Sequence, residues 1–432
     1  MFGTFERDRF VRREGYRERL IDRNVELYLS TFGAVCIEGP KWCGKTWTGL
    51  AHAKSAYMIA DPANNFSNRQ LAQLDVNKAL EGDGPHLIDE WQEVPAVWDA
   101  VRFRVDESPA PGRFILTGSS TPKTKGIVHS GTGRIARLAM HPMSLYESGD
   151  SSGEVSLGAV CRGEPIGVVA LECPSVERLT SLVVRGGWPG ALGLSDEQAI
   201  LIPREYVENV IGIDIHRIDG IERDSGKVRK CLRSLARNES TSATTSTIRN
   251  DIAEVDDSSF SINTVSGYLD AFKRLFLTHD TESFSTFLRS PVRIKQQAKR
   301  RFCDPSIPAA LLGATPGMLM RDLRTFGLLF ESLAVRDLEI YGEALGAKLY
   351  HYQDYDNDEF DAVLQFPDST WCAFEVKYNP DDIEAAARQL VKTSKKFVHN
   401  PPKALAIIVG KHGIAHRRED GVYVLPLTSL KP

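Results

Sequence analysis

The sequence lacks the usual features of a secreted or membrane-spanning protein. Its seven cysteines are an odd number, are widely scattered and include no CxxC pair. That pattern argues against a disulfide framework and a structural zinc site, and it favours a reducing compartment. No apolar run approaches the roughly 18 residues that span a bilayer. The charged N-terminus also has no signal-type apolar stretch. We therefore expect a soluble, cytoplasmic protein without membrane contact.

The composition is that of an ordinary globular protein. Of 432 residues, 42% are hydrophobic and 25% are charged, so a sizeable core can form. The formal net charge of −4 points to no class of partner. The length exceeds one typical domain and favours two or three. Changes of pattern predict a nucleotide domain over 1–150, a lid or helical region over 151–283 and a C-terminal α/β domain over 284–432.

Short apolar runs alternate with helical patterns in the first third of the chain. Strands separated by helices indicate parallel βαβ units, so we predict an α/β multidomain protein whose first core is a parallel sheet. The runs are AVCIE (34–38), YMIAD (57–61), HLIDE (86–90), FILTG (114–118) and IARLAM (135–140).

The octet GPKWCGKT follows the first run and matches the phosphate-binding pattern GxxxxGK[ST], with an apolar strand before it and a helical pattern after it. Its glycines let backbone N–H groups surround phosphates, and the helix N-terminus favours negative charge. Lys45 can reach the β- and γ-phosphates, and the Thr46 hydroxyl can ligate Mg²⁺. The residues that we assign to ATP are Gly39, Pro40, Lys41, Trp42, Cys43, Gly44, Lys45 and Thr46.

Two acids end an apolar strand about 44 residues beyond Lys45. Asp89 is suited to the Mg²⁺ hydration shell and Glu90 to polarising the attacking water. Helix capping is the alternative role for both acids. The next strand ends LTGSS, where Thr117 or Ser119 could contact the γ-phosphate or the water, although a plain turn would use the same residues.

The run over 85–122 resembles a prokaryotic branch of the AAA+ ATPases, whose members carry a strand ending DE-x-Q-x-x-P and a later LTGS. The matching positions are Asp89, Glu90, Gln92, Pro95 and Leu116 to Ser119. Further matching segments are YRERLID (16–22), Gly131 to Arg134, HPMSLYE (141–147), RGGWPGAL (185–192) and YVENVIGIDI (206–215). The resemblance thus spans most of the chain, and it implies ATP hydrolysis followed by a C-terminal domain of unassigned function.

AAA+ enzymes usually take an arginine from a neighbouring subunit to stabilise charge in the transition state. Arg134 and Arg137 lie after the LTGSS strand, where this family could place such a finger, and Arg134 is our candidate. Surface arginines would give the same pattern. For a sensor-2 arginine, Arg185 is a guess. A homo-oligomer or a protein partner is therefore an expectation that the sequence leaves open.

The segment over 245–277 has the rhythm of a helix-turn-helix, and the family resemblance implies a winged-helix fold there. Its second helix has apolar residues at core-facing spacing, namely Val265, Tyr268, Leu269, Phe272 and Leu275. Its outer face would carry Asn263, Ser266, Asp270, Lys273 and Arg274. DNA contact does not follow automatically, because many such modules only pack against other domains and Asp270 is acidic.

No acid occurs between Ser283 and Cys303, and the window holds six cations: Arg289, Arg293, Lys295, Lys299, Arg300 and Arg301. Such segregation suits contact with a phosphate backbone. The alternatives are a solvated connector and a patch that faces an acidic neighbour.

The C-terminal third resembles the PD-(D/E)xK nuclease fold in its order of a helix with Glu331, a strand with Asp361 and a strand with Glu375 and Lys377. Because alternate residues of a strand share a face, Glu375 and Lys377 would point to one side. Asp361 and Glu375 would bind Mg²⁺ or Mn²⁺, and Lys377 would orient or deprotonate the water that attacks a phosphodiester. A salt-bridged remnant without catalysis is the alternative.

Together these patterns predict an ATPase that acts on nucleic acid through a winged helix and a nuclease-like domain. Two other functions fit the same residues. One is an ATP-dependent switch or scaffold with a silent nuclease-like domain, and the other is a regulator that binds DNA without cutting it.

Overall fold

The computed structural model describes residues 14–108, 110–121, 127–253, 260–286 and 298–432. The chain divides into two compact units. Unit 1 comprises residues 1–142, 216–221 and 274–276, and unit 2 comprises 143–215, 222–273 and 277–432. By contacts the first boundary falls after Pro142, and the predicted middle and C-terminal regions share one unit. Their separation into domains at 150 and 283 stays a prediction.

Unit 1 is built on a five-stranded parallel sheet of order β2–β3–β4–β1–β5. The strands are β1 (Ala34–Glu38), β2 (Ser55–Met58), β3 (His86–Asp89), β4 (Phe114–Gly118) and β5 (Ile135–Ala139). Four of them lie within the predicted apolar runs, and β2 begins two residues before the run YMIAD and shares only Tyr57 and Met58 with it. The prediction of a parallel α/β core is therefore confirmed.

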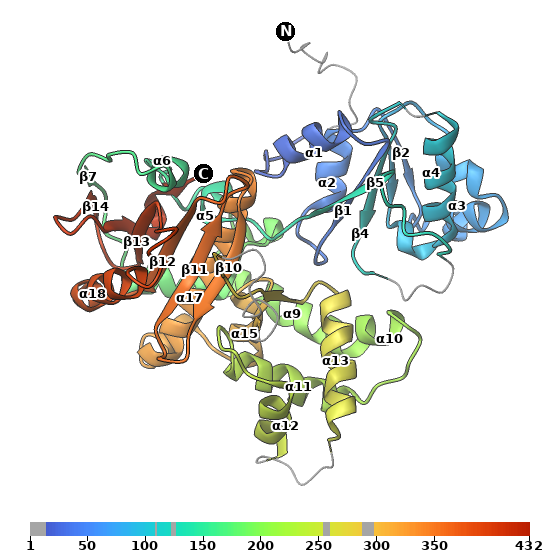
Figure 1. Ribbon diagram of the computed structural model, residues 1–432. Helices are drawn as coiled ribbons and strands as arrows, with labels where there is room; N and C mark the ends of the chain where they lie inside the picture. Colours follow the sequence, from blue (N-terminus) through green and yellow to red (C-terminus); the bar gives the residue numbers. More distant parts are fainter. Residues whose placement is uncertain (1–13, 109, 122–126, 254–259, 287–297) are drawn as a thin grey trace. The chain divides into compact units, whose positions relative to one another are not determined.

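Helices cover both faces of this sheet (Figure 1). They are α1 (Asp22–Leu29) and α2 (Lys45–Ala51) on one face, and α3 (Ala63–Leu74) and α4 (Ala96–Glu107) on the other. Val35 and Ile37 join the core under α1 and α2, whereas Ala34 and Cys36 join the core under α3 and α4. A strand buried on both faces needs apolar residues at every position, which explains the continuous runs.

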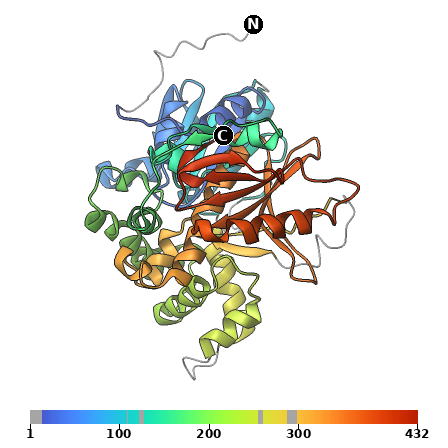
Figure 2. The same cartoon turned by 90° about the vertical axis from the view of Figure 1, so that its left-hand side faces the viewer.

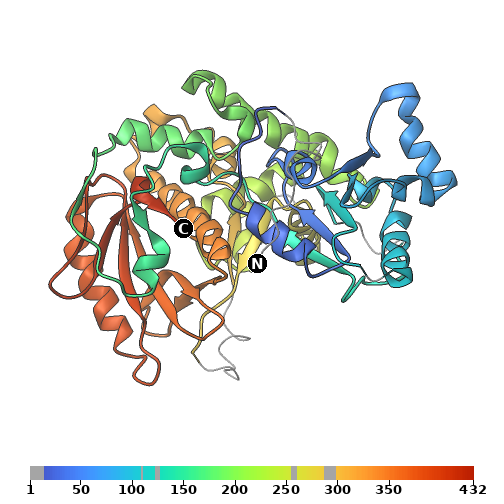
Figure 3. The same ribbon diagram turned by 90° about the horizontal axis from the view of Figure 1, so that it is seen from above.

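Unit 2 contains a seven-stranded mixed sheet of order β10–β11–β12–β13–β15–β14–β7. The strands are β7 (Val169–Ala170), β10 (Lys348–Gln353), β11 (Glu359–Gln365), β12 (Trp371–Lys377), β13 (Ala404–Val409), β14 (Ile414–Arg417) and β15 (Tyr423–Pro426). Helices α17 (Leu323–Ala344) and α18 (Ile383–Ser394) cover opposite faces (Figures 1 and 3). Figure 2 shows α18 lying across the strands, where Ala387 and Leu390 pack in one core with Trp371.

The weakly patterned segment after residue 150 belongs to the C-terminal fold. Its β6 (Val155–Ser156) pairs with β16 (Leu430–Lys431), and its β7 pairs with β14. The sequence suggested a lid or a linker here, because strands of two residues leave no periodic signal. This part of the predicted lid region instead extends the C-terminal sheet.

Most of the remaining helices come, along the chain, after the last strand of the unit 1 sheet and before β10 of the unit 2 sheet. They are α5 (Leu145–Ser148), α6 (Leu157–Cys161), α7 (Val176–Arg185), α8 (Asp196–Ala199), α9 (Leu201–Asn209), α10 (Ile215–Arg217), α11 (Ser225–Arg237), α12 (Thr245–Ala253), α13 (Ile262–Arg274), α15 (Ser306–Leu311) and α16 (Pro316–Leu319). Helices α12 and α13 match the predicted pair, and all five predicted core residues of the second helix are buried. An antiparallel hairpin of β8 (Thr278–Thr281) and β9 (Lys299–Phe302) follows α13. No helix in the described ranges is long and apolar enough to cross a membrane.

The structure gives acidic or carbonyl partners to several cations that the sequence placed on the surface, and it corrects one expectation. Arg274 does not stay on an outer face, because its guanidinium donates to the carbonyl of Ile218 at 2.9 Å and pairs with Asp219 at 3.3 Å. In the basic window, Arg289, Arg293 and Lys295 lie outside the described residues. The window's other three cations each lie within 4 Å of an acid, in the pairs Lys299–Glu359, Arg300–Asp280 and Arg301–Glu331. These pairs agree with the alternative of a patch that faces acidic neighbours, and phosphate contact by the three cations stays a prediction.

A buried ion-pair network anchors α17. The Arg336 guanidinium lies 2.9 Å from Asp304 and 2.7 Å from Asp337. Burial opposes the charge on Arg336, but the two carboxylates outweigh it and raise the pKa of this residue. Asp304 also accepts from the Gly187 backbone at 2.9 Å, and Asp337 from the Leu145 backbone at 3.0 Å. The network thereby connects one residue of HPMSLYE directly to α17, and one residue of RGGWPGAL to α17 through Asp304.

We predict that Arg336→Met lowers the free energy of unfolding of the full chain by about 3–5 kcal/mol, because two buried carboxylates lose their partner. Lys348→Met is the matched control, since Lys348 pairs with Glu282 on the surface at 2.9 Å, and it should cost less than about 1 kcal/mol. Urea denaturation measures both. Equal losses in the two variants would contradict a stabilising role for the network.

Candidate nucleotide site and acidic cluster

The phosphate-binding loop lies between β1 and α2, and its backbone depends on two glycines. Gly44 has φ of 109°, a conformation that L side chains rarely adopt. A Cβ on Gly39 would lie 2.1 Å from the Met140 carbonyl oxygen, so no other residue fits. Trp42 also has a left-handed φ, of 66°, and its side chain is 60% exposed. Strain at a bulky residue is typical of functional loops.

The Lys45 ammonium lies within this loop and is buried. Its Nζ donates to the Gly39 carbonyl at 2.9 Å and to the Pro40 carbonyl at 2.7 Å. Both acceptors are uncharged. A phosphate would therefore offer the ammonium a stronger, charge-assisted hydrogen bond at the same loop.

Thr46, Asp89 and Thr117 meet at the carboxyl ends of β3 and β4. Asp89 Oδ1 accepts from Thr46 Oγ1 at 2.9 Å and from Thr117 Oγ1 at 2.5 Å. Burial raises the pKa of Asp89, and these two hydroxyls act against that rise. A hydroxyl beside a carboxylate is an oxygen donor set that fits Mg²⁺. Thr117 thus supports Asp89 and is itself fully buried.

Glu90 follows Asp89 and has a left-handed backbone, with φ of 57° and ψ of 47°. Its Oε2 accepts from Ser119 Oγ at 2.8 Å and from the Gln92 side-chain amide. The structure therefore brings together Lys45, Thr46, Asp89 and Glu90 at one end of the sheet, with Thr117 and Ser119 bonded to the two acids.

Arg19 is a site residue whose role the sequence did not reveal. Its buried guanidinium donates to the Cys43 carbonyl at 2.6 Å and to the His141 carbonyl at 2.9 Å. It thereby fixes the phosphate-binding loop to the segment after β5. The only signal was its place in the YRERLID segment, because an arginine that binds carbonyls leaves no pattern of its own.

The structure gives each of the three predicted arginines an acidic partner within its own unit. Arg134 precedes β5 and pairs with Asp106 at 2.7 Å, at the end of β1 opposite to the loop. The length of β1, about 13 Å at 3.3 Å per residue, separates the two. Arg137 pairs with Glu38 at 2.5 Å and stacks on Trp98. Arg185 pairs with Asp150 at 2.5 Å.

In unit 2 the predicted acids and lysine gather around β11 and β12. Lys377 Nζ lies 2.8 Å from Glu375 Oε1, so these residues share a face. Asp361 Oδ2 accepts from the Val376 backbone at 2.8 Å. The register between β10 and β11 shifts near Asp361, as happens at a β-bulge. Bulges re-aim side chains and occur often beside active sites.

The charges of this cluster exceed what its cations compensate. Burial, together with the charge of Asp361, raises the pKa of Glu331 to about 7 and that of Glu375 to about 8. Burial opposes the charge of Lys377, but Glu375 and Asp361 outweigh it and raise its pKa. Glu375 Oε2 is buried without a hydrogen-bond partner among the described residues. Carboxylates in excess, with a free oxygen, fit a divalent cation.

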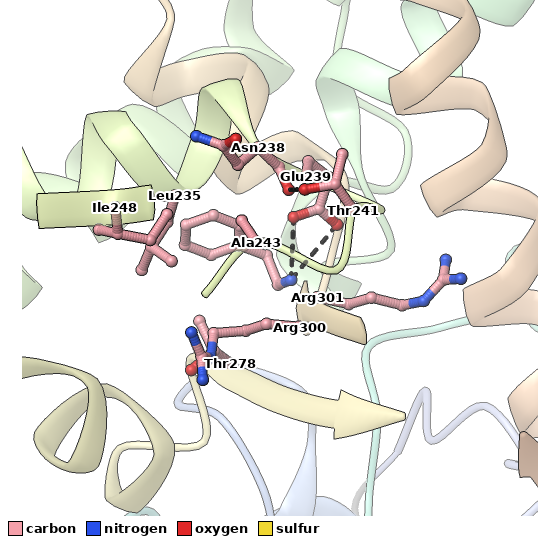
Figure 4. Close-up of a pocket in the computed structure, with 10 residues that line it drawn as sticks. Leu235, Asn238, Glu239, Thr241, Ala243, Ile248, Thr278, Arg300 and Arg301 are labelled. Atoms are coloured by element: carbon pink, nitrogen blue, oxygen red, sulfur yellow. Dashed lines mark hydrogen bonds between the residues drawn. The ribbon is translucent and has the colours of Figure 1, made fainter. Parts of the chain in front are cut away.

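A pocket beside this cluster is lined by Glu239, Thr241 and Thr278, among others (Figure 4). The buried Glu239 accepts from Ser332 Oγ at 2.7 Å, and burial raises its pKa to about 7. Arg300 and Arg301 point in opposite directions from β9, so they do not converge on one ligand.

Comparison with known families divides the chain into three segments. Residues 31–149 match a family described as an AAA domain. Residues 176–317 and 326–430 match two domains of unknown function, DUF8612 and DUF4143. Uncharacterized proteins of Mycobacterium bovis and Mycobacterium tuberculosis are each 31% identical over 123 residues, which are 28% of this chain and 27% of the relative. The match thus spans about a quarter of those relatives' length.

Solved structures give weaker likenesses. A Walker-type ATPase of Pyrococcus abyssi has a TM-score of 0.44 at 16% identity, over 70% of this chain and 98% of that chain. A RuvB variant of Thermotoga maritima has a TM-score of 0.25 at 15% identity, over 60% and 88%. Neither adds to the fold assignment. The matched AAA profile covers the phosphate-binding loop and both acids, so residues 31–149 are a P-loop ATPase domain of the AAA type, and residues 326–430 are a C-terminal domain of unassigned function.

Proposed function

We propose that this chain binds ATP at the loop of residues 39–46 and hydrolyses it with Mg²⁺. One observation carries the proposal: Asp89 shares a hydrogen bond with Thr46, and Glu90 stands beside them at the same strand end. Helix capping by these acids would leave that convergence unexplained. Neither acid caps a helix by a side-chain hydrogen bond in the structure.

Each residue then has a part in the reaction. Lys45 exchanges its two carbonyl acceptors for phosphate oxygens, and Thr46 and Asp89 are the residues that would hold Mg²⁺. The ion, when bound, neutralises charge on the phosphates. Glu90 accepts the proton of the attacking water through its carboxylate. Arg134 of a neighbouring copy would supply the missing cation, since it lies too far from the loop of its own chain.

We predict that Glu90→Gln keeps ATP binding and abolishes turnover, because an amide cannot accept the proton from water. Glu93→Gln is the matched control, since Glu93 is three residues away and pairs with Arg69 on the surface. Phosphate release and equilibrium binding of radiolabelled ATP measure the two properties separately. Wild-type turnover in Glu90→Gln would remove Glu90 from its role.

For unit 2 we propose a metal-dependent phosphodiesterase centre at Asp361 and Glu375, with Lys377 acting on the attacking water. The uncompensated carboxylates, the free Oε2 of Glu375 and the bulge beside Asp361 support it. Their order on a helix and two neighbouring strands is that of the PD-(D/E)xK fold. Mg²⁺ or Mn²⁺, when bound, would polarise the phosphodiester.

We predict cleavage of DNA that requires Mg²⁺ or Mn²⁺ and is lost in Lys377→Ala. Lys403→Ala is the control, because Lys403 is an exposed lysine of the same unit. The assay uses linear, supercoiled and single-stranded substrates, with and without ATP. If the wild type cuts none of them, the centre is a silent remnant.

A second candidate function is an ATP-dependent switch or scaffold with a silent C-terminal domain. Two contacts favour it: Lys377 is bonded to Glu375, and the buried Arg301 lies 3.7 Å from Glu331. Lys377 and Arg301 each neutralise part of the charge of a carboxylate that could otherwise bind a metal ion. The cleavage assay decides between the two candidates.

We further propose that α12, α13 and the β8–β9 hairpin form a winged-helix module that contacts DNA. The order of helices followed by a hairpin supports it, as does the exposure of Asn263, Ser266 and Lys273 on α13. The acidic Asp270 on the same face and the buried cations of β9 weaken it. DNA contact would therefore depend on few cations.

We predict that duplex or single-stranded DNA stimulates ATP hydrolysis at low salt and that about 200 mM salt abolishes the effect, since phosphate contacts release counterions. Lys273→Glu should remove the stimulation and leave the basal rate unchanged. Lys54→Glu, at an exposed lysine of unit 1, should change neither. A rate of ATP hydrolysis that DNA does not change at low salt would favour the ATP-dependent switch or scaffold.

A further inference from the structure

The backbone of Glu90 is held in an uncommon conformation by its neighbours. Its φ of 57° and ψ of 47° lie in the left-handed region, and this conformation is energetically unfavourable for any residue that has a Cβ atom. The Glu90 N–H donates to Thr117 Oγ1 at 3.2 Å, which fixes this turn at the end of β4. A strained residue persists only where the surroundings determine it. The direction of the Glu90 side chain is therefore set by the site and not by local preference.

The Glu90 carboxylate is held through one of its two oxygens. Oε2 accepts from Ser119 Oγ at 2.8 Å and from Gln92 Nε2, and Gln92 Nε2 also donates to Ser119 Oγ at 3.2 Å. The three side chains thus form a closed triangle of hydrogen bonds. In the described part of the chain, no hydrogen bond reaches Oε1. One oxygen is fixed, and the other is left for water.

The residue type at position 92 matches this task. A glutamine amide nitrogen carries two N–H donors, and here Nε2 lies within hydrogen-bond distance of both Glu90 and Ser119. The Ser119 hydroxyl accepts from one side chain and donates to the other, so the bonds polarise one another. A carboxylate at position 92 would keep the shape and lose both donors. An alanine at position 92 would leave Ser119 as the one remaining side-chain donor to the Glu90 carboxylate in the described residues.

We infer that Gln92 is a positioning residue for ATP hydrolysis, which orients Glu90 by clamping Oε2 together with Ser119. The inference rests on the proposed hydrolytic role of Glu90 and assigns Gln92 no contact with nucleotide. Loss of a hydrogen bond to the Glu90 carboxylate misdirects this base in the step in which water attacks the phosphate, and not in the step in which ATP binds. Its effect therefore falls on kcat and not on the binding of ATP.

The test measures kcat, KM and ATP affinity in the full-length protein. Gln92→Ala and Gln92→Met, a neutral side chain of similar length, should each lower kcat roughly 10- to 100-fold, the loss expected for a charge-assisted hydrogen bond. KM and ATP affinity should stay within about twofold of wild type. The control is Gln73→Ala, at an exposed glutamine on α3 of the same unit, and it should leave all three values unchanged. Because Gln92→Met nearly keeps the side-chain volume and adds no charge beside Glu90, it answers the question even if the alanine variant folds poorly.

A double-mutant cycle separates the clamp from a general structural role. If Gln92 and Ser119 act through the same oxygen, Gln92→Ala with Ser119→Ala should cost clearly less than the product of the two single losses. Ser119→Thr keeps a hydroxyl and should restore most of the activity that Ser119→Ala loses. Multiplicative losses, or a loss that appears in ATP affinity, would overturn the clamp.

The failure of this inference is distinct from the failure of the proposed function. Turnover by Glu90→Gln at the wild-type rate would overturn both. An inactive Glu90→Gln variant beside wild-type kcat in both Gln92 variants would overturn the role of Gln92 alone.

Discussion

The parallel pairing of β3, β4 and β1 is the constraint on which the nucleotide site depends. Parallel strands end at the same edge of a sheet. This pairing alone therefore brings together the residues that follow Glu38, the acids after Ile88 and the hydroxyls after Leu116. Burial on both faces then fixes the register, because a slip of one residue would turn the polar ends into the apolar cores. The hydrogen bonds among Thr46, Asp89 and Thr117 follow from this arrangement.

The sequence predicted this unit well because each of its signals is local. The runs of β1, β3 and β4 are continuous and apolar, and the glycine, lysine and acid positions follow them at fixed distances. What the sequence could not show were residues whose partners are backbone atoms or lie far away in the chain. Arg19 binds two carbonyls, one of them 122 residues away, and neither composition nor periodicity records such a contact.

The cations of unit 2 show the opposite limit. Lys299, Arg300 and Arg301 formed a charged run that suited a phosphate backbone, yet they pair with Glu359, Asp280 and Glu331. A run of like charges in the sequence shows the sign of the charge, but it does not show which acidic side chains lie beside it in the fold. The short strands β6 and β7 escaped notice for a related reason, since two residues cannot display a period. The shared face of Glu375 and Lys377, by contrast, was predictable because alternate residues of one strand point to the same side.

The two acidic centres differ in how their carboxylates are held. Asp89 and Glu90 are fixed by neutral hydroxyl and amide donors, which orient an oxygen and leave its negative charge available to a cation. Glu375 and Glu331 are instead paired with Lys377 and Arg301, which cancel part of the charge that a metal would use. In the proposed centre of unit 2 a metal would have to compete with these cations, whereas in the described residues the side-chain hydrogen bonds to Asp89 and Glu90 come from neutral groups. Neutral donors therefore suit a site that receives a charged ligand, and the Gln92 amide is one of these donors.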